Sequence, residues 1–120
     1  MINIKKVLVT GSEGFIGSEV VKYLLSKGLK VNALVLYNFK NDQGFLSQIN
    51  HKNLKIFFGD IRDEKTIEFA LQNSKYIINL AALIGIPYSY TAPKSYFETN
   101  TIGTLNLLNV ALKNGIKKFI

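Results

Sequence analysis

The 120-residue sequence has no cysteine and no tryptophan, and it has one methionine, one histidine and two prolines. Without cysteine the chain forms no disulfide and no thiolate metal site, which fits a reducing cytoplasm. No hydrophobic run approaches the roughly 18 residues of a membrane span, and the first residues do not form a secretory leader. We therefore expect a cytoplasmic protein with no membrane partner.

Acidic side chains are also few, with eight against 15 lysines and arginines and a formal net charge of +7. The lysines are scattered along the chain and form no stripe interleaved with aromatics, so we expect no nucleic-acid partner. We interpret the charge as general solubility with mild attraction for an anionic substrate. The lone histidine, His51, is expected at the surface, and without a cluster of ligands no metal site is predicted.

Hydrophobic residues are abundant at 48%, and they occur in short runs separated by turns and helical patterns. Strands are expected at Ile4–Thr10, Lys30–Tyr37, Leu54–Phe58 and Tyr76–Ala81, and a fifth begins at Lys117. Helices are expected at Phe15–Lys27, at Phe45–Asn50, after the cap Asp63, and from Pro93 to Gly115. Ala82–Ala92 is expected to be a loop. In the last helix we assign a stripe of Ile102, Leu105, Leu108 and Leu112 to the core, and Gly103 to close packing.

This alternation of strands and helices predicts an α/β fold. We expect a Rossmann-type doubly wound parallel sheet, helices on both faces and strand order 3-2-1-4-5. Residues 1–120 are expected to form one domain. Because such sheets usually carry a sixth strand, we expect this domain to be the N-terminal part of a longer protein.

Three glycines follow the first expected strand with the spacing Gly-x-x-Gly-x-x-Gly. Gly11 allows a tight turn, Gly14 lets the backbone approach phosphates, and Gly17 lets the helix pack close to the strand. The unpaired N–H groups and the positive dipole end of the helix then face the anion. We predict dinucleotide binding at this turn by Gly11, Glu13, Gly14, Phe15, Ile16 and Gly17.

The end of the second strand lacks the expected ribose-binding acid, which usually lies about 20 residues past the glycines. Tyr37 and Asn38 occupy this place, without an acid or a nearby arginine. Asn38 can bond a ribose hydroxyl, and Asp42 lies further along the loop. The absence of both leaves the choice between NAD and NADP open at this point. With the glycine turn, residues 1–120 are predicted to form one NAD(P)-binding domain.

Two further strand ends carry candidate cofactor contacts. After the third strand, Asp60 is expected to accept a hydrogen bond from the adenine amino group while Ile61 packs on the base. The alternative for Asp60 is a helix cap, a role that we assign to Asp63. After the fourth strand, small residues let the nicotinamide side of the cofactor lie close to the backbone. These residues are Leu80, Ala81 and Ala82.

The Thr-Gly-x-x-Gly-Phe-Ile-Gly pattern of residues 10–17 resembles the signature of the extended short-chain dehydrogenase/reductase family, which includes sugar-nucleotide epimerases and dehydratases. Asp60-Ile61 resembles the family's adenine-binding pair and Leu80–Ala82 its second cofactor motif. Asn100, Gly103 and Thr104 resemble its Asn-x-x-Gly-Thr helix, in which the asparagine is chiefly structural. Residues 35–38, 44–46 and especially 81–96 are most similar to the UDP-N-acetylglucosamine 4,6-dehydratases of the legionaminic-acid pathway.

The resemblance implies an NAD-dependent enzyme that eliminates water from a nucleotide sugar through transient oxidation at C4. Tyr88 and Ser89 become candidate substrate contacts, with packing of their loop as the alternative. The resemblance also implies a homodimer formed through a helix pair that includes Pro93–Asn114. Its catalytic residues follow the fifth strand, so we expect no catalytic residue in this chain and no activity from it alone. Tyr90 and Lys94 have the spacing of the family's Tyr-x-x-x-Lys pair, but Pro93 between them makes this a chance match.

Two alternatives stay open. The first is a nucleotide-sugar 4-epimerase or reductase of the same family, which product analysis separates from a dehydratase. The second is a non-catalytic dinucleotide-binding module.

Overall fold

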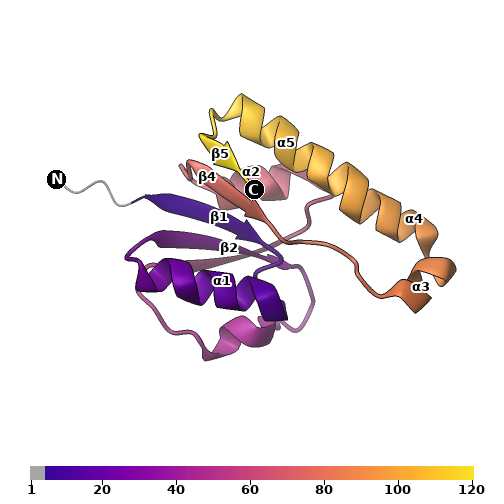
Figure 1. Ribbon diagram of the computed structural model, residues 1–120, viewed down its shortest axis with the longest axis horizontal. Coiled ribbons are helices and arrows are strands. Elements are labelled where there is room, and N and C mark those ends of the chain that lie inside the picture. The colour runs from indigo at the N-terminus through magenta and orange to yellow at the C-terminus, as the bar shows by residue number, and fades with distance from the viewer. Residues whose placement is uncertain (1–4) are drawn as a thin grey trace.

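The computed structural model describes residues 5–120, which form a parallel sheet with helices on both faces (Figure 1). The sheet has five strands in the order β3-β2-β1-β4-β5, as predicted. All neighbouring strands are parallel. The strands are β1 (Lys6–Thr10), β2 (Lys30–Leu36), β3 (Leu54–Gly59), β4 (Tyr76–Asn79) and β5 (Lys118–Phe119).

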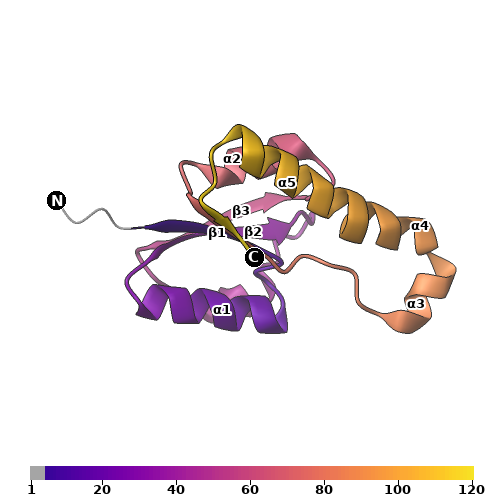
Figure 2. The same cartoon turned by 45° about the horizontal axis from the view of Figure 1, so that its top comes forward.

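The helices divide between the two faces of the sheet (Figure 2). One face is covered by α1 (Phe15–Ser26) and the short 3₁₀-helix η1 (Gly44–Gln48). The opposite face is covered by α2 (Glu64–Leu71) and α5 (Gly103–Lys113). Because both faces are covered, consecutive residues of the central strands are buried on alternate sides, as expected for a parallel α/β sheet.

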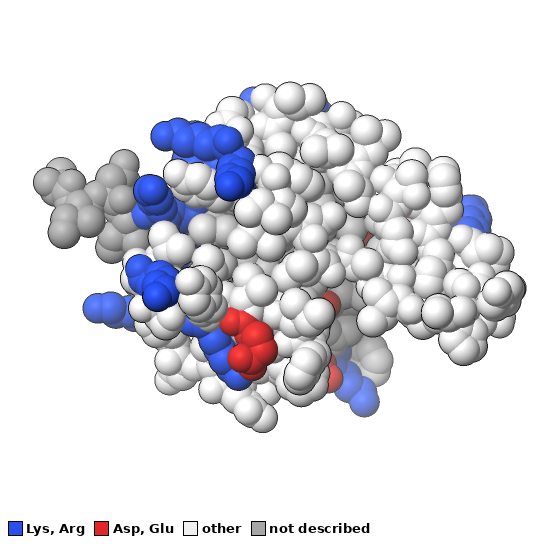
Figure 3. Space-filling view, viewed as in Figure 1, with Lys and Arg blue, Asp and Glu red and all other residues white. Residues whose placement is uncertain are grey.

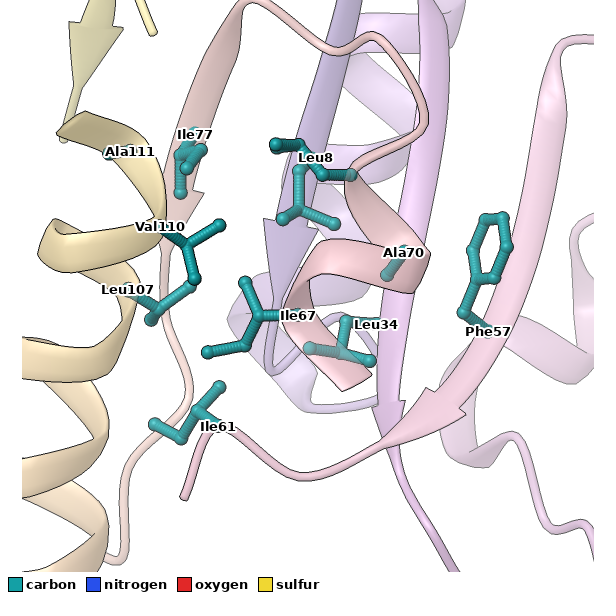
Figure 4. Close-up of a cluster of buried hydrophobic side chains, with 11 residues drawn as sticks. Leu8, Leu34, Phe57, Ile61, Ile67, Ala70, Ile77, Leu107, Val110 and Ala111 are labelled. Atoms are coloured by element: carbon teal, nitrogen blue, oxygen red, sulfur yellow. The ribbon is translucent and has the colours of Figure 1, made fainter. Parts of the chain in front are cut away.

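Two hydrophobic clusters result from this alternation. Leu8, Leu34 and Ile77 pack against α2 and α5 (Figure 4), and Val7 and Val9 pack on the α1 side. In α5 the buried residues are Gly103, Leu107, Val110 and Ala111.

The core stripe that we assigned to the last helix is therefore wrong. Leu105, Leu108 and Leu112 are 50%, 41% and 82% exposed. The helix turns a neighbouring face toward the sheet, because Gly103 permits close contact there. A Cβ at Gly103 would lie 2.6 Å from Ile61 Cδ1, which confirms the expected packing role of this glycine.

Several boundaries differ from the sequence prediction. Ile4, the expected start of the first strand, lies outside the described residues. The second strand ends at Leu36 rather than Tyr37, and the fourth ends at Asn79 rather than Ala81. Just beyond the end of this strand, the backbone N–H of Leu80 donates to the carbonyl and hydroxyl oxygens of Thr10.

The expected loop Ala82–Ala92 contains a helix, α3 (Ile86–Thr91). Pro87 lies in its first turn, where a missing N–H has no cost. The helix carries no buried residue, so the sequence offers no hydrophobic stripe to predict it.

The long helix is continuous from Pro93 but not uniform. It begins with α4 (Pro93–Tyr96), passes through a π-helical turn at Phe97–Ile102 and continues as α5. Such π-turns insert a residue into the helix and often mark functional sites.

Candidate functional site

The glycine turn joins β1 to α1 at the carboxyl edge of the sheet. Gly11 has a φ of +61°, which favours glycine, and a Cβ there would lie 2.6 Å from the carbonyl of Leu80. A Cβ at Gly17 would lie 2.0 Å from the carbonyl oxygen of Gly11. Both positions require glycine, so the tight turn and the close helix packing predicted from the sequence are confirmed.

The start of α1 is not capped by a side chain. Gly14 is its N-cap, and the first turn contains no acidic residue. In α2, by contrast, the Asp63 carboxylate accepts a hydrogen bond from the Lys65 backbone N–H (3.0 Å), which confirms its predicted cap. A Cβ at Gly14 would approach nothing closer than 3.4 Å, so the described residues leave space beside this helix start. An uncapped helix start beside free space is suited to a phosphate group.

Thr10 connects the ends of β1 and β4 beneath the turn. Its hydroxyl donates to Asn79 Oδ1 (2.6 Å) and accepts from the backbone N–H groups of Leu80 and Ala81, both at 3.1 Å. Leu80 is 37% exposed and Ala82 is exposed, whereas Ala81 packs against the core. The expected second cofactor motif therefore lies beside the glycine turn. Sequence reasoning missed Thr10, although a polar residue that ends an apolar strand is a usable signal.

The loop after β2 uses its polar side chains internally. The Asn38 amide donates to the carbonyl oxygens of Leu36 (3.2 Å) and Asp42 (2.9 Å), and its oxygen accepts from the Asp42 N–H (2.8 Å). Asp42 in turn accepts from the Gly44 N–H at 2.8 Å. Asn38 is thus near the expected ribose position, but its two amide donors are already engaged.

At the end of β3, the Asp60 carboxylate pairs with the guanidinium of Arg62. Arg62 Nη2 lies 2.7 Å from Asp60 Oδ2, and Arg62 Nη1 lies 3.9 Å from Glu98 Oε2 on the π-helical turn. Burial acts to raise the pKa of Asp60, but hydrogen bonds from Arg62 outweigh it and hold this pKa below its ordinary value. Asp60, Arg62 and Glu98 line an open hollow together with Lys94 and Phe97. The sequence did not identify Arg62 and Glu98 as residues that line this hollow.

Ile61 does not present its side chain to this hollow. It is only 4% exposed and points into the cluster formed by the sheet, α2 and α5 (Figure 4). The expectation that this side chain packs on the adenine is therefore wrong, because the contact with Gly103 holds it in the core. A contact from Ile61 to a bound base is restricted to its backbone.

The two candidate substrate residues lie on α3, away from the sheet (Figure 1). Tyr88 is 57% exposed and its ring lies 6.2 Å from that of Tyr96. The Ser89 hydroxyl donates to the Ile86 carbonyl at 2.6 Å, a bond within its own helix. Tyr90 and Lys94 belong to different helices, so they do not share a helix face.

Two further predictions concern ions and membranes. His51 is exposed, and residues 5–120 contain no group of three or more histidine or acidic side chains placed to hold a metal ion. No helix in the described part of the chain is long and apolar enough to cross a membrane.

Comparison with known proteins decides the family. The family model described as GDP-mannose 4,6 dehydratase matches residues 8–120. The chain belongs to this family. The chain is also similar to proteins of both expected kinds, a nucleotide-sugar 4-epimerase and a nucleotide-sugar 4,6-dehydratase.

A UDP-glucose 4-epimerase of Pisum sativum is 33% identical over 97% of the chain and 35% of its own length. A UDP-N-acetylglucosamine 4,6-dehydratase (inverting) of Campylobacter jejuni is 31% identical over 100% of the chain and 36% of its own length. The crystal structure of the Thermus thermophilus UDP-glucose 4-epimerase complex with NAD superposes with a TM-score of 0.77. It is 33% identical over 95% of the chain and 36% of the solved chain. The sequence thus spans about a third of the length of these relatives.

Proposed function

We propose that this chain is the cofactor-binding part of an NAD-dependent nucleotide-sugar 4,6-dehydratase of the UDP-N-acetylglucosamine type. The observation that carries the proposal is the glycine turn with its uncapped helix and free space beside Gly14. The Campylobacter relative, which is similar to the whole chain, supports the dehydratase assignment.

In this proposal, bound NAD supplies a reversible acceptor for the hydride at C4 of the sugar, which permits elimination of water across C5 and C6. The residues of this chain bind and orient the cofactor and the nucleotide sugar. The α1 start and Gly14 hold the pyrophosphate, Asp60 and the Ile61 backbone contact the adenine, and Leu80–Ala82 lie along the nicotinamide side. Tyr88 and Ser89 are proposed to meet the nucleotide sugar.

The proton-transfer residues are proposed to lie outside residues 1–120. The Tyr90 and Lys94 pair is divided between α3 and α4. We therefore expect the 120-residue chain alone to bind the cofactor without turnover, and the domain to act within a longer protein.

Titration calorimetry with NAD and with NADP tests the cofactor assignment, and we expect NAD to bind more tightly. The measurement uses the full-length gene product that carries this sequence. If that protein binds neither dinucleotide, the proposed function is wrong.

A nucleotide-sugar 4-epimerase is the second candidate, because the Pisum sativum epimerase is as similar to the chain as the Campylobacter dehydratase. Mass spectrometry of the product formed from UDP-N-acetylglucosamine separates the two. A dehydratase product is lighter than the substrate by one water, whereas an epimer has the substrate's mass.

A further inference from the structure

Glu13 places a carboxylate at the end of β2, although it comes from the glycine turn. Its Oε1 accepts a hydrogen bond of 3.1 Å from the backbone N–H of Leu36, the last residue of β2. Its carbonyl oxygen accepts from the Phe45 N–H at 3.0 Å, and a Cβ at Gly44 would lie 2.6 Å from that oxygen. These contacts fix the backbone of Glu13 against the start of η1.

The second carboxylate oxygen of Glu13 has no partner. Glu13 Oε2 is buried and has no hydrogen-bond donor within residues 5–120. A buried carboxylate oxygen without a donor is destabilising, and native proteins seldom contain one without a functional reason. The missing donor can come from a bound molecule.

The alternative acceptors at this strand end are engaged elsewhere. Asn38 Oδ1 accepts a hydrogen bond from the Asp42 N–H, and the Asn38 amide donates to the carbonyl oxygens of Leu36 and Asp42. Asp42 is exposed and accepts from Gly44, which stabilises the turn of that loop. Glu13 is therefore the acid at the end of β2 that retains a free, water-shielded acceptor.

We propose that Glu13 substitutes for the missing acid of β2, accepting hydrogen bonds from the adenosine ribose hydroxyls and disfavouring a 2′-phosphate. This inference rests on the proposed dinucleotide binding. A carboxylate held near the 2′ position gains a charge-assisted hydrogen bond from a hydroxyl, whereas it repels a phosphate. Glu13 thereby selects NAD over NADP, a choice that the sequence of β2 leaves open.

The test compares the unaltered protein with Glu13→Gln by titration calorimetry with NAD, NADP and an NAD analogue that lacks the adenosine 2′-hydroxyl. The glutamine oxygen keeps the bond from Leu36 and removes the charge. We expect the variant to bind NAD about tenfold more weakly while NADP binding is unchanged or stronger. The unaltered protein should bind the deoxy analogue about tenfold more weakly than NAD, and the variant should not discriminate between them.

Glu19→Gln is the matched control, because it removes the same charge from the exposed face of α1, where Glu19 pairs with Lys22. It should leave all three affinities unchanged. If NAD binds but Glu13→Gln retains the NAD preference, the assignment of Glu13 is wrong and the proposed function stands. If Glu13→Gln does not fold, equal binding of NAD and its deoxy analogue by the unaltered protein overturns the assignment. Failure of every dinucleotide to bind overturns the proposed function instead.

Discussion

Gly14 and Gly17 belong to one motif but differ in the space around them. A Cβ at Gly17 would lie 2.0 Å from a backbone oxygen, whereas a Cβ at Gly14 would approach nothing closer than 3.4 Å. We expect Gly17→Ala to lower the free energy of unfolding by about 1–3 kcal/mol, because the turn or the helix must shift. Urea unfolding measures this loss.

Gly14→Ala should separate binding from stability. Its new methyl group enters space that we assign to the pyrophosphate, so NAD binding should weaken at least tenfold while the urea midpoint stays close to that of the unaltered protein. Calorimetry and urea unfolding on the same preparation test this. A large loss of stability in Gly14→Ala, or tight NAD binding by it, would contradict the assignment of that space.

The Asp60–Arg62 pair should make stability depend on acid pH. The folded pKa of Asp60 lies below its ordinary value, so the pair stabilises the fold above the unfolded pKa and this contribution is lost as the pH falls through the folded pKa. Asp60→Asn should therefore be less stable at pH 7 by at most about 1 kcal/mol, since the pair is partly exposed. The difference should shrink at pH values below about 4. Thermal unfolding at pH 7 and pH 3 measures it, and a difference that grows toward low pH would contradict the prediction.

For single residues, the sequence predicts contacts between positions that are close in the chain. It misses contacts that depend on how two strands pair. Gly17 and Asp63 act on backbone close to them in the sequence, and the φ of +61° at Gly11 belongs to the turn itself, so spacing alone identified all three. The bond from Leu36 to Glu13 joins residues that are 23 positions apart, and it exists because β1 and β2 pair in one particular register. The role predicted for the Ile61 side chain was wrong because Gly103, which holds it in the core, is far from it in the sequence.

At the scale of elements, the side chain of Asn100 holds the segment before α3 against the π-helical turn. Its amide donates to the Leu83 carbonyl and its oxygen accepts from the Leu83 N–H, both at 2.9 Å. We expect Asn100→Ala to lower stability by about 1 kcal/mol and to increase hydrogen exchange in residues 83–92. Asn109→Ala is the control, because its amide contacts Glu64 on α2 instead. Equal exchange in residues 83–92 of both variants would mean that Asn100 does not hold this segment.

The elements that the sequence predicted well are those with a buried face or a recognisable cap. The five strands and α1, α2 and α5 have such signals. The helix α3 has no such signal, since it buries no residue. The π-helical turn adds a single residue to the helix, which the spacing of hydrophobic residues in the sequence does not reveal. The predicted orientation of α5 was wrong because the helix has two neighbouring apolar faces, and only its packing against the sheet and α2 selects one of them.

For the whole molecule, the fold gathers lysines that are scattered in the sequence. Strand register places Lys6 beside Lys30, and the Lys75 N–H donates to the Lys6 carbonyl while the Lys117 N–H donates to the Lys75 carbonyl. Lysines accordingly cluster at the side where the strands begin (Figure 3). Burial, together with repulsion from Lys30 and Lys55, lowers the pKa of Lys6. This edge is opposite the glycine turn, so attraction of an anionic ligand is better assigned to the start of α1 than to the lysines of this edge.

The outer face of the long helix is the surface that we propose to form the homodimer. Leu105, Leu108 and Leu112 are exposed on α5, and Phe97 on the preceding turn is 58% exposed. The spacing of the three leucines puts them on one face of the helix, and exposed apolar surface of this kind commonly marks an interface between proteins. We expect the full-length protein to sediment as a dimer, and the double variant Leu105→Glu/Leu108→Glu to sediment as a folded monomer, since burying two carboxylates in an interface is unfavourable. Phe39→Glu alters an apolar side chain that is 85% exposed on the loop after β2, and it should remain dimeric. A dimer that persists in the double variant would place the interface elsewhere, and a monomeric unaltered protein would mean that another part of the molecule covers this helix face.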